Sequence, residues 1–122
     1  MPARAVLPLL LCVALGCGFL IGTGISDINA RPAKYYQHKV SFRGEIVRSQ
    51  RLASETLLEV EDERGSRILV RSAAPVEFAN GDWIRVRGIL VPDARVGDVT
   101  VYDVVMAEEI SGARAPRFRN LF

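Results

Sequence analysis

The stretch LLEVEDERGSRILVR, residues 57–71, decides the fold because it predicts two paired β-strands and the turn that joins them. In residues 57–62 and again in residues 66–71, alternate side chains are apolar, and this period of two is typical of a half-buried strand. The linker Glu63-Arg64-Gly65 fits a three-residue loop whose glycine takes the left-handed conformation. We therefore predict a β-hairpin at the centre of the chain.

The register of this hairpin follows from the length of its loop. It sets Val60 opposite Ile68 and Glu61 opposite Arg67. An apolar pair and an acid–base pair across neighbouring strands both stabilise the ladder. The side chains therefore support the alignment that the turn predicts.

Three further segments, residues 40–46, 83–90 and 98–106, predict strands on either side of the hairpin. The first two alternate between an apolar and a polar face. The apolar faces carry Val40, Phe42, Ile46, Ile84, Val86 and Leu90, and the polar faces carry Ser41, Arg43, Glu45, Arg85 and Arg87. Five short strands predict a small all-β domain whose antiparallel sheet closes into a barrel, because closure removes the exposed edges.

Two of these strands share a local pattern, apolar-Arg-Gly-x-aliphatic. It occurs in Phe42-Arg43-Gly44-Glu45-Ile46 and in Val86-Arg87-Gly88-Ile89-Leu90. A glycine inside a strand marks a bend or a close approach of another backbone. In a barrel whose first strand neighbours its fourth, both glycines would lie at sharply curved points.

Two segments outside the strands predict helical structure. Ser26-Asp27 predicts the cap of a short helix over residues 27–37, interrupted at Pro32. Residues 75–78 predict a single helical turn between the third and fourth strands. No long helix is expected anywhere in the domain.

The remaining segments predict turns, loops and a tail. Asn80-Gly81-Asp82 is a turn signal, and residues 50–56 and 91–97 predict the two loops that usually form the binding face of such a barrel. Residues 111–122 contain three arginines, no acid and no periodicity. They predict a flexible basic tail.

Composition divides the 122 residues into two unlike parts. Residues 5–25 carry no charge, whereas residues 27–122 hold all 14 Asp and Glu and all but one of the 16 Lys and Arg. The chain is too short for a multidomain enzyme and, at a net charge of +2, too apolar for a disordered protein. Both cysteines, Cys12 and Cys17, lie in the uncharged part, which excludes a disulfide scaffold. We expect a membrane-directed segment at 1–25, a folded domain at 26–110 and the tail at 111–122.

The uncharged segment has three interpretations. It is long enough to span a membrane as a signal anchor. Ala14-Leu15-Gly16-Cys17 also resembles a bacterial lipobox, which makes Cys17 the lipidation candidate, and cleavage of an ordinary signal before Arg31 is the third. Positive charges lie on both sides of the segment, so the evidence on its orientation in the membrane is divided. Because the segment is of the type that directs export, we expect the domain on the outer, periplasmic face.

Four pieces of the domain match a known pattern: Ile25-Ser26-Asp27-Ile28 with residues 29–36, Val40 to Val47, Val60-Glu61-Asp62 with Gly65, and Asn80 to Gly88. On these pieces, residues 25–110 resemble a bacterial OB-fold domain of the tRNA-anticodon-binding-like type. The resemblance implies a five-stranded barrel preceded by a short helix. Barrels of this type bind nucleic acids, sugars, haem or proteins, so the function must be argued from a site.

The charge balance of the domain disfavours nucleic acid as a partner. Binding a single strand needs a positive groove and aromatic stacking platforms. Residues 25–110 contain 12 Lys and Arg against 14 Asp and Glu, a net charge of −2. The candidate ligand-binding residues are three arginines on one outward patch, two arginines in the predicted loops and one aromatic platform: Arg43, Arg85, Arg87, Arg51, Arg95 and Tyr102.

Catalysis, metals and cofactors have little basis in the sequence. The domain has no cysteine, and its one histidine, His38, precedes the first strand, so the usual nucleophile–base pairs and zinc sites are missing. A family of membrane-anchored haem chaperones has a similar barrel, but its haem-attaching histidine lies beyond the barrel. The acidic residues between Glu59 and Glu63 alternate between strand faces. We expect no enzyme activity, no metal and no cofactor.

Two functions from different classes therefore remain. The primary expectation is a non-catalytic binding module of the bacterial cell envelope, held to the membrane through residues 5–25, that binds an unknown protein or a small polar ligand. The alternative is a binder of single-stranded nucleic acid. The net negative domain behind an export-type segment favours the first.

Overall fold

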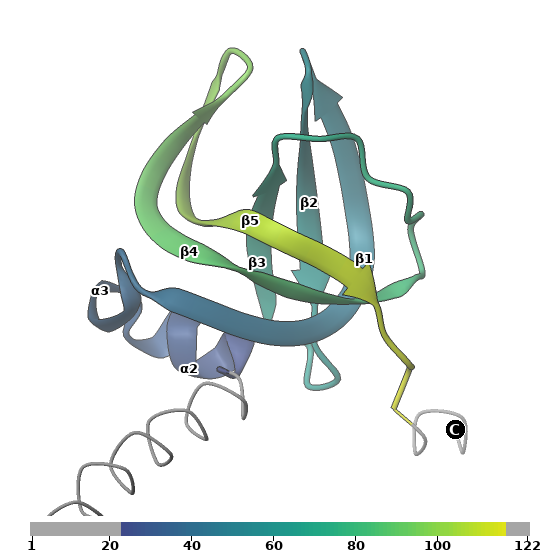
Figure 1. Ribbon diagram of the computed structural model, residues 1–122. Helices are drawn as coiled ribbons and strands as arrows, with labels where there is room; N and C mark the ends of the chain where they lie inside the picture. Colours follow the sequence, from purple (N-terminus) through teal and green to yellow (C-terminus); the bar gives the residue numbers. More distant parts are fainter. Residues whose placement is uncertain (1–22, 117–122) are drawn as a thin grey trace, which may run out of the picture.

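The computed structural model describes residues 23–116, which form a closed five-stranded barrel with two short helices at one end (Figure 1). The elements are α2 (Ile25–Ala30), α3 (Pro32–Tyr35), β1 (Lys39–Leu52), β2 (Glu55–Glu61), β3 (Arg67–Ser72), β4 (Trp83–Val96) and β5 (Val99–Gly112). The expected all-β architecture with a short N-terminal helix is confirmed, but the sheet is not wholly antiparallel, because β3 and β5 pair in parallel.

The strand order around the barrel is β1-β2-β3-β5-β4, and β4 returns to β1. The first strand therefore neighbours the fourth, which is the arrangement in which both glycines were expected to lie at sharply curved points. A Cβ atom on Gly88 would lie 2.3 Å from the carbonyl oxygen of Met106, and one on Gly44 would lie 2.6 Å from Cγ1 of Val60. Both glycines are needed because neighbouring strands approach too closely for a side chain.

The β2–β3 hairpin has the predicted register. Val60 pairs with Ile68 and Glu61 with Arg67. Gly65 has a φ of +88°, in the left-handed region that glycine tolerates best. The Asp62 carboxylate accepts hydrogen bonds from the backbone N–H groups of residues 64 and 66, which fixes the turn.

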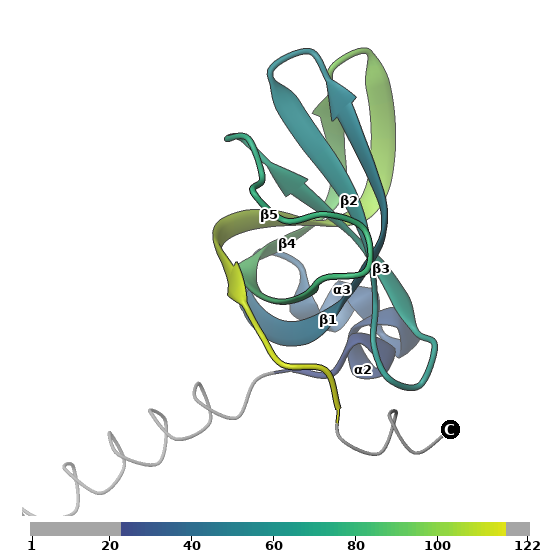
Figure 2. The ribbon, with the colours of Figure 1, turned by 90° about the vertical axis from the view of Figure 1, so that its right-hand side faces the viewer.

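The strands β1, β4 and β5 are much longer than predicted, with 14 residues each. The prediction of loops at residues 50–56 and 91–97 is wrong, because most of those residues belong to strands. Only Ala53 and Ser54 lie between β1 and β2, and only Gly97 and Asp98 lie between β4 and β5. Both hairpins extend beyond the closed barrel into solvent (Figures 1 and 2). Their strand ends therefore carry polar side chains, which in the sequence are typical of loops.

Three smaller expectations also need correction. Gly24, not Ser26-Asp27, is the N-cap of α2, and no side chain caps it; the helix is instead held by Ile25 and Ile28, each 1% exposed in the core. Residues 75–78 form no helical turn and have no regular secondary structure. Strand β5 continues to Gly112, two residues into the predicted tail, because Ser111 pairs with Arg85.

The core consists of two clusters. The larger fills the barrel with the inward residues of all five strands and with Ile25 and Ile28 of α2. The smaller contains Val96, Val101 and Val104 and lies between the two long hairpins. The candidate site consists of residues that pack on this smaller cluster.

The predicted membrane-directed segment falls largely on residues 1–22, and the end of the predicted tail falls on 117–122. Both lie outside the described residues, so the anchor, the lipidation of Cys17 and the periplasmic address stay predictions. Within residues 23–116, no helix is both long enough and apolar enough to cross a membrane.

Candidate functional site

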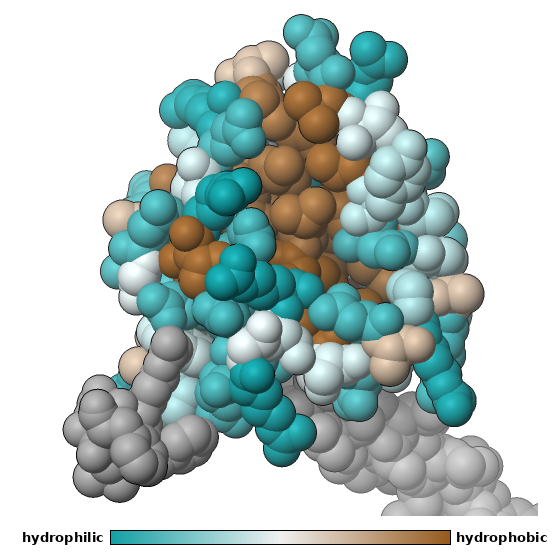
Figure 3. Space-filling view, turned by 180° about the vertical axis from the view of Figure 1, so that it is seen from behind, coloured by the Kyte–Doolittle hydropathy of each residue, from teal (hydrophilic) through white to brown (hydrophobic). Residues whose placement is uncertain are grey.

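A continuous apolar strip runs along one face of the molecule between two hydrophilic margins (Figure 3). It lies over the outer face of β2 and β3 and over the facing side of the β4–β5 hairpin. We call it the apolar strip, and it consists of the half-buried side chains that pack on the smaller core cluster: Leu52, Leu57, Leu69, Val91, Ala94 and Met106. An apolar face that stays open to solvent on a small domain marks a binding surface.

The two long hairpins flank this strip and touch near their tips. The backbone N–H of Gly97, in the β4–β5 turn, donates a hydrogen bond to Oε2 of Glu55 at 3.2 Å. A Cβ atom on Gly97 would lie 2.9 Å from Cβ of Leu52. The positive φ of +60° at Gly97 lets the turn approach β1 this closely.

Glu55 joins three elements at this point. Its Oε1 accepts hydrogen bonds from the guanidinium group of Arg71 in β3, while its Oε2 holds the turn of the β4–β5 hairpin. The Arg71 hydrogen bonds, followed by the Gly97 N–H, hold the pKa of the Glu55 carboxyl below its usual range. The carboxylate form of Glu55 therefore fastens the two hairpins together.

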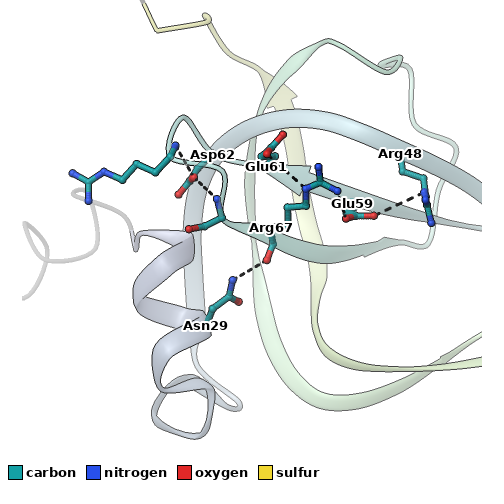
Figure 4. Close-up of polar contacts among 8 residues, drawn as sticks. Asn29, Arg48, Glu59, Glu61, Asp62 and Arg67 are labelled. Atoms are coloured by element: carbon teal, nitrogen blue, oxygen red, sulfur yellow. Dashed lines mark hydrogen bonds and ion pairs between the residues drawn. The ribbon is translucent and has the colours of Figure 1, made fainter. Parts of the chain in front are cut away.

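Ion pairs occupy the other end of the outer face of β2 and β3 (Figure 4). Nη1 of Arg67 lies 3.1 Å from Oε1 of Glu59, its Nε lies 3.6 Å from Oε1 of Glu61, and Nε of Arg48 lies 3.9 Å from Oε2 of Glu59. The hydrogen bond to Glu59, followed by the charge of Glu61, raises the pKa of the Arg67 guanidinium. The carboxylates are thus neutralised by arginines of the same face, and among residues 23–116 no group of acidic, histidine or cysteine side chains could hold a metal ion.

Three of the candidate residues belong to the two hairpins that form the rim of the apolar strip. Arg51 lies near the tip of the β1–β2 hairpin and Arg95 near the tip of the β4–β5 hairpin; both are exposed, and neither forms an ion pair within the described part of the chain. Tyr102, on β5 opposite Asp93, is 68% exposed. The structure therefore places two cations and one aromatic ring on the hairpins that flank one apolar face, although in strands and not in loops.

A half-buried tyrosine, Tyr36, binds the residue that follows the exposed Tyr102. Asp103 has a positive φ of +50°, and its Oδ1 accepts a hydrogen bond from the hydroxyl of Tyr36, the residue that follows α3. This hydrogen bond raises the pKa of the Tyr36 hydroxyl. The unusual backbone at Asp103 lets both Val104 and Val105 be buried, in different clusters, and leaves Tyr102 outward. The sequence gives no signal for the roles of Tyr36 and Asp103, because both depend on a contact between residues that are 67 positions apart.

The other three candidates lie on a second face, where β1 pairs with β4. Arg43 and Arg85 are exposed and directly opposite each other, and Arg87 is exposed opposite Ser41. Nη1 of Arg87 lies 3.6 Å from Oε2 of Glu109. We call Arg43, Arg85 and Arg87 the basic strip. Arg43 and Arg85 form no ion pair with a described residue, and the three arginines share one outward face on neighbouring strands.

Comparison with known proteins gives the fold and no family. No protein-family model matches the chain, and no curated protein matches it. Among solved structures, it is similar to asparaginyl-tRNA synthetase from Pyrococcus horikoshii (TM-score 0.53, 17% identity, 68% of this chain and 21% of that chain). It is also similar to aspartyl tRNA synthetase from Entamoeba histolytica (TM-score 0.56, 14% identity, 78% and 22%). The chain thus spans about a fifth of the length of these synthetases, and likeness at these identities establishes the OB-type barrel alone.

These neighbours overturn the primary functional expectation. The sequence favoured a membrane-anchored envelope module for a protein or a small polar ligand, and disfavoured nucleic acid. Both solved chains named above are tRNA synthetases, which agrees with the alternative of a nucleic-acid binder. The expectation weighed the net charge of the whole domain, which does not describe how charge is distributed over its separate surfaces.

Proposed function

We propose that this chain binds single-stranded nucleic acid along the apolar strip, and that it binds without catalysis. The observation that carries the proposal is an open apolar face on β2 and β3, flanked by two hairpins that carry the exposed residues Arg51, Arg95 and Tyr102. In OB-type barrels, this face and the connections between strands 1 and 2 and between strands 4 and 5 bind oligonucleotides.

The apolar strip suits the bases of an unpaired strand. Bases that are not paired expose flat, weakly polar faces, which stack on aromatic rings and pack on aliphatic side chains. Tyr102 supplies an exposed ring, and Leu57, Leu69 and Met106 supply the aliphatic floor. A paired duplex offers no such faces, so we expect selectivity for single strands.

The rim suits the phosphates. Arginine binds phosphate oxygens through paired hydrogen bonds, and its charge displaces counterions from the strand. Arg51 and Arg95 lie on opposite hairpins, whose tips meet where Gly97 contacts Glu55. Because neither is held by a described carboxylate, both are available to a phosphate without breaking an ion pair.

Fluorescence anisotropy of labelled single-stranded DNA and RNA, measured from low to high salt, tests the proposal. We expect binding that weakens as salt rises, because counterions are released. The Arg51→Gln/Arg95→Gln variant removes two positive charges, which should lower the slope of log K against log salt by roughly 1.4 if both contact phosphates. Tyr102→Ala should weaken binding by about 1–3 kcal/mol at every salt concentration, because one base loses its stacking partner.

The matched control is Arg31→Gln/Lys34→Gln, which removes the same charge from α3 and its N-cap. It should leave the salt slope nearly unchanged. Equal slopes for the rim variant and the control, or no binding of any single strand at low salt, would show that the apolar strip is not a nucleic-acid site. Unlabelled duplex of the same sequence, which should compete poorly, checks the strand selectivity.

A further inference from the structure

The basic strip lies on a face of the molecule that the proposed function does not use. It belongs to the ladder between β1 and β4, where the inward residues Phe42 and Val86 are buried in the core. Lys39, at the start of β1 and opposite Ile89, is exposed on the same face as the arginines and continues the strip. The cations of this face are thus Lys39, Arg43, Arg85 and Arg87.

These cations are close together and poorly neutralised. Arg43 and Arg85 are direct cross-strand partners, and like charges at such positions repel. Within residues 23–116, no carboxylate forms an ion pair with Lys39, Arg43 or Arg85. Arg87 pairs with Glu109 at 3.6 Å, but both side chains are more than half exposed, and such a pair contributes little to stability. An anion bound to the strip would relieve the repulsion, so the arrangement indicates an anionic ligand.

The spacing of the strip suits a polyanion of high charge density. Residues two positions apart on one strand, such as Arg85 and Arg87, are separated by about 6.7 Å, and neighbouring strands lie about 4.8 Å apart. From Lys39 to Arg43 the strip therefore extends about 13 Å along β1. Over that length a nucleic-acid duplex carries about eight phosphate charges, because it has one for each 1.7 Å or so of its axis. One strand of that duplex carries half as many.

The strip offers partners to phosphates and none to bases. Its other outward residues are Ser41 and Ile89, neither of which has an aromatic ring. The next outward pair along the ladder, Glu45 and Trp83, is already engaged by other groups. Unpaired bases need stacking platforms, whereas contacts to the phosphates of a duplex position a protein without reading its sequence. The basic strip therefore favours paired nucleic acid.

Acidic side chains limit the extent of the strip. Asp27 and Glu63 line the hollow at the Arg43 end, and Glu109 lies on β5 beside Arg87. They would repel the phosphates of a strand that ran across the strip toward α2 or toward β5. Contact is therefore confined to a few phosphates along the β1–β4 ladder, and the affinity for a duplex should be low.

We propose that the basic strip is a second nucleic-acid site, which binds the phosphate backbone of a duplex without reading its sequence. Arg43 and Arg85 are its central contacts, and Lys39 and Arg87 extend it. The inference goes beyond the proposed function, because it concerns another ligand on another face of the barrel. A duplex on the basic strip would not displace a single strand from the apolar strip.

Fluorescence anisotropy of a labelled blunt DNA duplex, titrated with the full-length chain from low to moderate salt, tests the proposal. We expect weak binding that is lost as salt rises, because counterions are released. Arg43→Gln/Arg85→Gln should lower the slope of log K against log salt by roughly 1.8, since each phosphate contact to B-DNA contributes about 0.9. Duplexes of equal length and different sequence should bind equally.

The matched control is Arg31→Gln/Lys34→Gln, which removes the same charge outside the β1–β4 ladder and should keep the duplex slope. The Arg43→Gln/Arg85→Gln variant should bind a labelled single strand as the unchanged chain does. Its thermal unfolding should show no loss of stability, because the substitution relieves a like-charge pair. Ser41→Glu is a second variant, which removes no cation but adds a carboxylate to the strip, and it should also weaken duplex binding.

The proposal is overturned if the duplex does not bind at low salt, or if the arginine variant and the control have the same salt slope. It is also overturned if a single strand displaces the duplex at the concentration that saturates the apolar strip, since both ligands would then share one site. Its failure is distinct from that of the proposed function, which is measured with single strands and the Arg51, Arg95 and Tyr102 variants. Single-strand binding without duplex binding would leave the proposed function intact and remove the second site, and duplex binding alone would do the reverse.

Discussion

The apolar strip and the basic strip are built in opposite ways. The basic strip follows from simple alternation: Phe42 and Val86 point into the barrel, so Arg43, Arg85 and Arg87 must point out. The apolar strip exists because two hairpins that look like loops in the sequence extend past the barrel and cover a second core. One surface depends on local periodicity, and the other depends on contacts between distant segments.

This difference indicates where each surface is vulnerable. The apolar strip depends on a few contacts at turns and glycines, so a single substitution can disturb it. The basic strip is carried by the main ladder between β1 and β4, and its charges can be changed with little cost to the fold. Four substitutions test the contrast.

The largest effect is expected from Gly88→Ala, which should disturb both surfaces. The new Cβ would lie 2.3 Å from the Met106 carbonyl oxygen, a backbone atom that cannot move away without distorting β5. We expect a loss of about 3 kcal/mol in the free energy of unfolding, a large part of the stability of a small domain. Gly112→Ala is the control, because its Cβ would meet only the Phe78 ring at 3.5 Å. Equal urea midpoints for the two variants would contradict the close approach at Gly88.

Gly97→Ala should affect the apolar strip and spare the basic strip. Alanine at a φ of +60° is strained, and its Cβ would lie 2.9 Å from Cβ of Leu52. We expect a loss of about 1–2 kcal/mol together with weaker oligonucleotide binding, since the hairpin tips must separate. Gly81→Ala, at a φ of +94° but with open space around it, controls for the backbone strain alone. Oligonucleotide affinity should fall only in the Gly97 variant.

Acidification should loosen the same contact. The pKa of Glu55 is lowered in the folded state, so the stability that its carboxylate contributes is present above the ordinary value of 4.5 and is lost as the pH falls through the lower folded value. Glu55→Gln cannot ionise, so its deficit in melting temperature at neutral pH should shrink steadily below pH 4.5. A deficit that stays constant from pH 7 to the acid limit would mean that the Glu55 charge does not fasten the hairpins.

The smallest effect, of opposite sign, is expected from Arg43→Glu on the basic strip. It replaces a like-charge pair with Arg85 by an acid–base pair and should stabilise the domain by about 0.5 kcal/mol. Arg31→Glu makes the same change in net charge away from Arg85 and should not stabilise it. A lower melting temperature for Arg43→Glu than for Arg31→Glu would show that Arg43 already has a compensating partner.

Much of the barrel was predictable because its signals are local. The β2–β3 register, the left-handed glycine at position 65 and the inward faces of β1 and β4 all follow from periodicity and turn chemistry. The outward arginines were predictable for the same reason. The extent of β4 was not, because Pro92, Asp93 and Arg95 are typical of a loop and lie in a strand only through pairing with residues 99–102.

By itself, the sequence determined the five strands, the central hairpin and the side of the sheet on which each charged residue of the β1–β4 ladder lies, since alternation acts between neighbours along the chain. Only the tertiary structure decided that the ends of β1 and β4 become hairpin arms, that Glu55 joins β3 to the turn at Gly97, and that Asp103 meets Tyr36. These depend on segments that are distant in sequence and come together when the barrel closes. The surface proposed to bind single-stranded nucleic acid belongs to this second group, because an open apolar face arises only when the strands that line it are assembled.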